Sequence, residues 1–180
     1  MKIILVHLTK KCMLMKIPSA EVLQLNRYET TLCYIYGPNG VLMLHRTKKE
    51  NDINKDKYIG VGGHIEQGES PDECVVREVL EETGLEMRRF RLRGIITFVI
   101  DDIDELTFLY TCDDYSGELR ECSEGELIWV KEEQIESLPI WEGDKIFFRL
   151  LQEREDVFSL KLHYIHDRLV EARVDGKTVV

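Results

Sequence analysis

Three glutamates stand close together in the middle of the chain, at Glu78, Glu81 and Glu82. In an α-helix that turns about 100° per residue, all three lie in one sector about 100° wide. Carboxylates this close repel one another, and each tends to take up a proton unless a cation offsets the charge. Oxygen ligands that converge on one point suit Mg²⁺, with Mn²⁺ as a second choice. The spacing therefore predicts a divalent-metal site.

The competing interpretation is an acidic helix face that simply meets solvent, which is the usual role of such residues. The neighbouring residues decide between the two. Gly62-Gly63 lets the backbone approach a ligand closely, and Glu69 adds another acid at the start of the helix. Arg77 lies four residues before Glu81 and can brace its carboxylate. These neighbours favour the metal site.

A helix that holds these groups is well marked in the sequence. Ser70 is a predicted N-cap, Pro71 takes the first helical position, and Glu73 completes a capping box. Gly84 ends the helix as its C′ residue. The helix therefore extends over residues 71–83.

The side of this helix that packs on the rest of the molecule is predicted from its apolar residues. Four of them share a sector of roughly 140°, next to the sector of the glutamates. They are Val75, Val76, Val79 and Leu80. We expect this apolar sector to anchor the helix on a sheet and so to hold the carboxylates at its edge.

The other elements follow from hydrophobic patterning and turn residues. β-rich stretches are expected at residues 30–36, 41–45, 92–100, 106–112 and 126–130. A second helix is expected at residues 143–153, and a late hairpin at residues 158–164 and 168–174. The first two strands form a hairpin around Gly37-Pro38-Asn39-Gly40. Strands interleaved with two helices predict an α/β fold, an α/β/α sandwich around a mixed sheet.

The composition is that of one domain with an acidic surface. The chain has 180 residues, 43% of them hydrophobic, and a formal net charge of -10. This charge disfavours a nucleic-acid polymer as partner but allows a small anion delivered with metal ions. Five cysteines without a C-x-x-C pair predict buried thiols in a reducing cytoplasm. No apolar stretch near the start is long enough to span a bilayer.

The domain itself is expected to cover residues 27–180. Residues 1–26 are the least readable part, and two interpretations stay open: an extra strand and turn, or an extension upstream of the domain. The sequence leaves the oligomeric state open between a monomer and a homodimer.

The segment from Gly63 to Leu85 resembles the signature of the Nudix hydrolase family, G-x5-E-x7-R-E-U-x-E-E-x-G-U with U apolar, at every specified position. A chance match of that length is rarer than about one in a million at ordinary residue frequencies. The resemblance implies a Nudix-type fold and hydrolysis of a nucleoside diphosphate linked to another group. It also implies a small-molecule nucleotide as substrate.

The resemblance assigns roles to individual residues. Glu78, Glu81 and Glu82 are expected to ligate metal, together with the backbone carbonyl of Gly63. Glu69 supports the cluster and Arg77 orients it. Glu78 or Glu82 is our first choice for the general base. A further ligand or base outside the helix is expected at Glu124.

The region after the signature resembles the MutT-type 8-oxo-dGTP diphosphatases, in particular their mammalian-like branch. That resemblance implies that Trp141 stacks on the purine and that Asp144 bonds the edge of the base. The alternative is an ordinary core tryptophan and a first-turn helix acid. The chain departs from the branch at Gly143, where a second acid is common, and at Ile59, where an asparagine is common.

The remaining pocket candidates have two interpretations each. Phe98 and Tyr58 are expected either to line the base pocket or to belong to the core. Arg46 is a candidate for the triphosphate, with Lys48 and Lys49 beside it, against the alternative of a solvated loop.

The expected function is nucleotide-pool sanitation in support of DNA repair, by hydrolysis of 8-oxo-dGTP or a related oxidised purine nucleotide to the monophosphate and pyrophosphate. One alternative is a Nudix hydrolase that acts on a nucleotide sugar, a dinucleoside polyphosphate or an RNA 5′ end. Another is a nucleotide sensor without turnover, which the complete signature disfavours.

Overall fold

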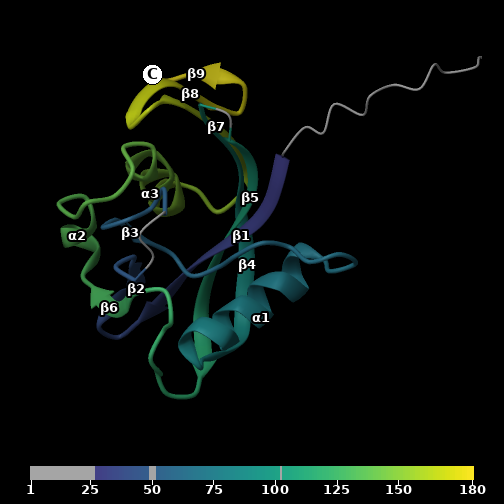
Figure 1. Ribbon diagram of the computed structural model, residues 1–180, viewed down its shortest axis with the longest axis vertical. Coiled ribbons are helices and arrows are strands. Elements are labelled where there is room, and N and C mark those ends of the chain that lie inside the picture. Colours follow the sequence, from purple (N-terminus) through teal and green to yellow (C-terminus); the bar gives the residue numbers. More distant parts are fainter. Residues whose placement is uncertain (1–26, 49–51, 102) are drawn as a thin grey trace, which may run out of the picture.

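The computed structural model describes residues 27–48, 52–101 and 103–180, and one mixed sheet runs through them (Figure 1). The expectations for residues 1–26 and for Lys49 lie outside this part of the chain. The strands are β1 (Arg27–Gly37), β2 (Gly40–His45), β3 (Tyr58–Ile59), β4 (Glu86–Ile100), β5 (Ile103–Ser116), β6 (Glu126–Val130), β7 (Phe158–Ile165), β8 (Arg168–Val174) and β9 (Lys177–Thr178). The helices are α1 (Pro71–Thr83), α2 (Glu132–Ile135) and α3 (Asp144–Glu153).

The strands follow one another across the sheet in the order β3-β2-β1-β5-β4-β7-β8-β9, and β6 pairs with β2. The pairs β1–β5 and β4–β7 are parallel, and the other neighbours are antiparallel. Parallel neighbours require a long crossover, and both crossovers in this chain contain a helix. The longer strands β4 and β5 run through the middle of the sheet.

Each face of the sheet is covered by a helix, with a separate apolar core beneath it. Along β1, Cys33 and Ile35 face the core under α1, whereas Tyr34 between them faces the core under α3. This alternation is what the two-residue period of a strand requires when both faces are buried. Figure 1 shows α1 on one side of the strands, with α2 and α3 on the other. The expected α/β/α layering is confirmed.

The ends of α1 agree with the sequence prediction. The hydroxyl of Ser70 accepts a hydrogen bond from the backbone N–H of Glu73, and the Glu73 carboxylate accepts one from the backbone N–H of Ser70. Gly84 follows the helix in the left-handed conformation, with φ 79°. Glycine adopts this conformation at little cost, so the chain turns directly into β4.

The buried face of α1 differs from the prediction. Val75 and Val79 are fully buried, but Val76 and Leu80 are 38% and 40% exposed. Cys74 is buried in their place, together with Thr83 at the end of the helix. The buried side is thus rotated toward the glutamates. The apolar pattern predicted the wrong buried side because cysteine and threonine also fit into a packed interface. The large aliphatic side chains of Val76 and Leu80 are left at the surface.

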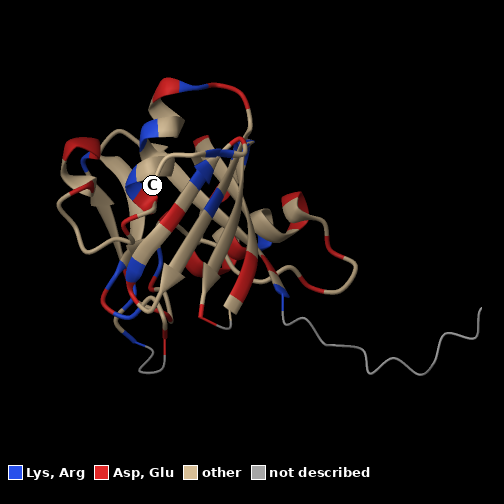
Figure 2. Cartoon of the chain, turned by 90° about the horizontal axis from the view of Figure 1, so that it is seen from above, with Lys and Arg blue, Asp and Glu red and all other residues tan. Residues whose placement is uncertain are grey.

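The other predicted elements lie at their expected places, with longer strands in the centre. β4 begins six residues before the stretch predicted at 92–100, and β5 extends beyond the stretch at 106–112 on both sides. The sequence prediction missed the short elements β3, α2 and β9. Acidic residues are spread over several elements of the fold, as Figure 2 shows.

Candidate active site

A cavity of about 530 Å³ opens beside α1 and extends between the sheet and α3. Glutamates of α1, the glycine-rich segment before the helix, and aromatic residues near α3 all line it. A volume of this size holds a nucleotide-sized ligand. All the residues expected to bind metal except Glu81 therefore border the same space as Trp141 and Asp144.

Glu78 and Gly63 lie against each other at this cavity. A Cβ atom placed on Gly63 would approach the Glu78 carboxylate to 2.5 Å. Any side chain at position 63 would therefore displace the carboxylate. The carbonyl of Gly63 already accepts a hydrogen bond from the backbone N–H of Thr31 at 2.9 Å, which holds this peptide on the sheet.

Glu82 is a partly buried carboxylate of the helix that lines the cavity. Its side chain accepts a hydrogen bond of 3.2 Å from the backbone N–H of Gly62. Burial raises the pKa of Glu82, and the nearby Glu124 and Glu78 raise it further. These carboxylates crowd a poorly solvated space, and a bound cation would relieve that crowding.

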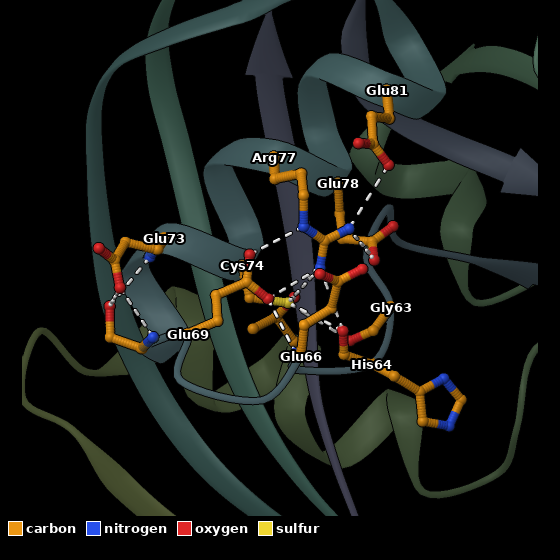
Figure 3. Close-up of polar contacts among 11 residues, drawn as sticks. Gly63, His64, Glu66, Glu69, Glu73, Cys74, Arg77, Glu78 and Glu81 are labelled. Carbon is orange, nitrogen blue, oxygen red and sulfur yellow. Dashed lines mark hydrogen bonds and ion pairs between the residues drawn. The ribbon is translucent and has the colours of Figure 1, made fainter.

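Arg77 organises the acidic groups on the outer side of the helix (Figure 3). Its guanidinium donates to both carboxylate oxygens of Glu69 at 2.8 Å, and to Glu78 at 2.7 Å. This contact is the main reason why the pKa of Glu69 is lowered to about 2. The expected contact with Glu81 is present but longer, at 3.4 Å. Arg77 thus braces Glu69 and Glu78 more closely than Glu81.

Glu81 stands apart from the other two helix glutamates. Its side chain is 60% exposed, against 15% for Glu78, and it does not line the cavity. Taking Cys74 as zero, the helix places Glu78 and Glu82 at about 40° and 80°, inside the buried sector, and Glu81 at about 340°. In the described part of the chain, no three His, Cys, Asp or Glu side chains are gathered as a ready metal site.

Arg46 and Glu124 meet at the same cavity. The guanidinium of Arg46 contacts Glu124 and lies 2.6 Å from a carboxylate oxygen of Asp52. Its side chain is only 11% exposed. Arg46 is therefore an ordered group of the cavity wall and not part of a solvated loop. Lys48 lies outside the wall and donates to the backbone carbonyl of Cys122.

Trp141 lines the cavity and is 5% exposed. Its indole N–H donates to Asn54 Oδ1 at 2.8 Å, and the Lys57 ammonium lies 4.3 Å from the ring centroid. Phe98 and Tyr164 meet the indole in edge-on contacts. Trp141 is thus packed in the core under α3 and also borders the cavity, and its stacking on a purine stays a prediction.

Asp144 is a buried acid at the start of α3. Its carboxyl accepts a hydrogen bond of 3.3 Å from the backbone N–H of Trp141. Burial raises the pKa of Asp144 to about 8, although the Trp141 N–H and Lys57 act in the opposite direction. At neutral pH this group is therefore a carboxylic acid that can donate a hydrogen bond as well as accept one.

The model of the NUDIX domain matches residues 26–151, which include α1, the glycine-rich segment and Trp141. The chain belongs to the NUDIX domain family. The resemblance on which the sequence prediction depended is confirmed, and so is the prediction that the chain is a hydrolase.

Relatives of this Nudix hydrolase agree with the assignment. It is 32% identical over 120 residues to the uncharacterised Nudix hydrolase YvcI of Bacillus subtilis, which covers 63% of this chain and 72% of that protein. An oxidized purine nucleoside triphosphate hydrolase of Danio rerio is 28% identical over 147 residues, 81% of this chain and 92% of that protein. A MutT protein from Bacillus halodurans superposes with a TM-score of 0.74 at 29% identity, over 83% and 99% of the two chains.

Nudix hydrolases generally use divalent cations, and the residues of this Nudix hydrolase fit such an ion. The carboxylates of Glu78, Glu82 and Glu124 border the cavity, and the backbone of Gly63 lies against Glu78. Hard divalent cations prefer oxygen ligands of this kind. A cation would also stabilise the charged form of Glu82, which burial disfavours.

The structure adds cavity residues that the sequence did not reveal. They come from β1, β4, β5, β7 and the segment before β3: Thr30, Thr31, Leu32, Tyr34, Ile96, Thr107, Leu162, Asp52 and Asn54. Strand alternation gives no sign of which buried positions border a cavity and which are covered. Phe98 lines the cavity as expected, whereas Tyr58 stacks on His45 and does not line it.

The described residues contain no helix that is long and apolar enough to cross a membrane. Nudix hydrolases act on small nucleotide substrates, in agreement with the expected partner class. The cytoplasmic location and the oligomeric state stay predictions.

Proposed function

We propose that this Nudix hydrolase converts 8-oxo-dGTP, or a related oxidised purine nucleoside triphosphate, to the monophosphate and pyrophosphate. The main support is the single cavity that carries carboxylates of α1 together with Trp141 and Asp144. One nucleotide in this cavity would have its triphosphate near Glu78 and Glu82 and its purine against Trp141. The name and coverage of the Danio rerio relative support the same substrate class.

The proposed ion is Mg²⁺, with Mn²⁺ as a substitute. Glu78, Glu82 and the Gly63 carbonyl would hold it, Glu124 would add an oxygen from outside the helix, and Glu81 joins the set by its place in the family pattern. A bound divalent cation polarises phosphate oxygens and lowers the pKa of a nearby water. We further propose that residues 27–180 form the catalytic domain.

The side chains of the chain itself have separate tasks in this proposal. Glu78 or Glu82 accepts the proton of the attacking water, because both carboxylates border the cavity. Arg77 keeps Glu78 and Glu69 in fixed positions through its short hydrogen bonds. Arg46, already held by Asp52, stands where it can meet the phosphates.

The base would be bound at the other part of the cavity. Trp141 borders the cavity, and its edge-on contact with Phe98 and its hydrogen bond to Asn54 keep the indole in one orientation. Such a preordered ring loses little entropy when a base stacks on it. Asp144, protonated at neutral pH, would donate to an acceptor on the base.

A nucleotide panel with Mg²⁺ tests the proposed function. The panel contains 8-oxo-dGTP, dGTP, a pyrimidine triphosphate, a nucleotide sugar, a dinucleoside polyphosphate and a capped RNA, and pyrophosphate and orthophosphate are measured separately. We expect pyrophosphate and the largest kcat/KM with the oxidised purine. Trp141→Ala should raise KM for that substrate about 10-fold or more, since base stacking contributes roughly 1–3 kcal/mol. Preference for another class, or an unchanged KM, would contradict the proposal.

A further inference from the structure

Asn54 joins the segment before β3 to the base end of the cavity. Its Oδ1 accepts the indole N–H of Trp141 at 2.8 Å, although the two residues are 87 positions apart in the chain. Asn54 also lines the cavity. Its place is fixed locally, because its backbone N–H donates to Asp52 Oδ1 at 2.9 Å and Asp52 is paired with Arg46.

The contact with Trp141 determines which way the amide faces. An indole N–H only donates, so the oxygen of Asn54 must point to it and the NH₂ group must point away. Among the described residues, none accepts a hydrogen bond from this NH₂ group. Asn54 therefore presents two donors beside a tryptophan that borders an open cavity.

A second polar group stands at the same end of the cavity. Asp144 follows Trp141 by three residues, and its carboxyl is held by the Trp141 backbone N–H. Because burial raises its pKa to about 8, the carboxyl carries a proton at neutral pH. Asn54 and Asp144, which both contact Trp141, are then donors, and donors are best matched by carbonyl oxygens of a ligand.

We propose that Asn54 is a specificity-determining residue, which holds the indole of Trp141 through Oδ1 and donates from Nδ2 to the 6-carbonyl oxygen of an oxopurine. This assignment rests on the proposed function and names the chemistry that selects its substrate. Asn54 lies outside the family signature. This chain has Gly143 and Ile59 at the positions where the mammalian-like branch commonly has an acid and an asparagine.

Two substitutions of Asn54 separate its two roles. Asn54→Asp keeps an oxygen for the indole N–H but removes both donors. Asn54→Ala removes the contact with Trp141 as well. Lys55→Ala is the matched control, because Lys55 lies on the same segment, is exposed and does not line the cavity.

The experiment measures KM and kcat of each variant with 8-oxo-dGTP and with 8-oxo-dATP, whose 6-position carries an amino group. Tryptophan fluorescence is recorded in parallel. For Asn54→Asp we expect KM for 8-oxo-dGTP to rise about 10-fold, because the 6-carbonyl oxygen of the base is left without its donor in the cavity. We expect kcat to change less than about two-fold, KM for 8-oxo-dATP to stay constant or fall, and the emission spectrum to stay that of the unmodified enzyme. Asn54→Ala should raise KM for 8-oxo-dGTP and also shift the emission spectrum, because it removes the contact with Trp141.

The outcomes distinguish this assignment from the function on which it rests. If the unmodified enzyme prefers oxopurine triphosphates and Asn54→Asp keeps the same preference for 8-oxo-dGTP over 8-oxo-dATP, only the role of Asn54 is overturned. Equal changes for both substrates would show that Asn54 only positions Trp141, which also overturns the assignment. An unmodified enzyme without any preference for purine triphosphates would overturn the proposed function and this assignment together.

Discussion

The two enclosed glutamates of α1 have different surroundings from the third. Glu78 and Glu82 lie in the buried sector of the helix, beside Cys74 and Val75, and both border the cavity. Glu81 lies at the edge of that sector and faces solvent. Burial of a carboxylate is costly without a partner, so the position of these two side chains is itself an indication of a cation or proton function.

We predict that Glu82→Gln lowers kcat about 100-fold or more, because the amide cannot take a proton from water and binds a cation weakly. The measurement is steady-state hydrolysis at saturating Mg²⁺. Glu121→Gln, an exposed surface change outside the cavity, serves as the control and should retain full activity. Comparable activity of both variants would contradict a role of Glu82 in the reaction.

We predict that Asp144 makes the metal-free protein less stable as the pH rises. Its pKa is about 8 in the folded state and about 4 in an unfolded chain. Between these values the folded state binds a proton that the unfolded state has lost, so the free energy of unfolding falls as the pH increases. Asp144→Asn should show a flatter profile from pH 4 to pH 8 in urea denaturation. An identical slope for both proteins would disprove the buried neutral acid.

At the scale of elements, the capped helix and most strands could be predicted because local residues specify them. Ser70 and Gly84 mark the ends of α1 without any tertiary information. The rotation of α1 could not be predicted, since Cys74 and Thr83 pack into the sheet as well as aliphatic residues do. Asn54 was missed for a similar reason: its contact with Trp141 depends on how distant segments meet.

Adjacent valines of α1 test this rotation. We predict that Val75→Ala lowers the free energy of unfolding by about 2 kcal/mol, because a fully buried side chain leaves a void. Val76→Ala should change it by less than about 0.5 kcal/mol, since that side chain is 38% exposed. Chemical denaturation of the two variants gives the comparison. Equal losses would support the wider apolar face expected from the sequence and count against the observed packing.

The whole molecule carries an excess of acidic groups, 34 against 24 basic ones, and the cavity concentrates several of them. We predict that Mg²⁺ raises the unfolding temperature, because an ion that binds only the folded state stabilises it, by about 2.7 kcal/mol at a hundred-fold excess over Kd. Glu82→Gln should lose most of this shift. Potassium chloride of the same ionic strength is the control, and an equal shift with it would indicate general screening and no specific site.

One cavity connects the proposed metal site with the proposed base pocket, because the carboxylates of α1 and the indole near α3 both border it. The most direct test is a crystal structure with Mn²⁺ and the monophosphate product, in which anomalous scattering locates the ion. We predict an anomalous peak roughly 2.2 Å from oxygens of Glu78 and Glu82, with the purine stacked on Trp141. An ion bound elsewhere, with those carboxylates in bulk solvent, would contradict the central claim.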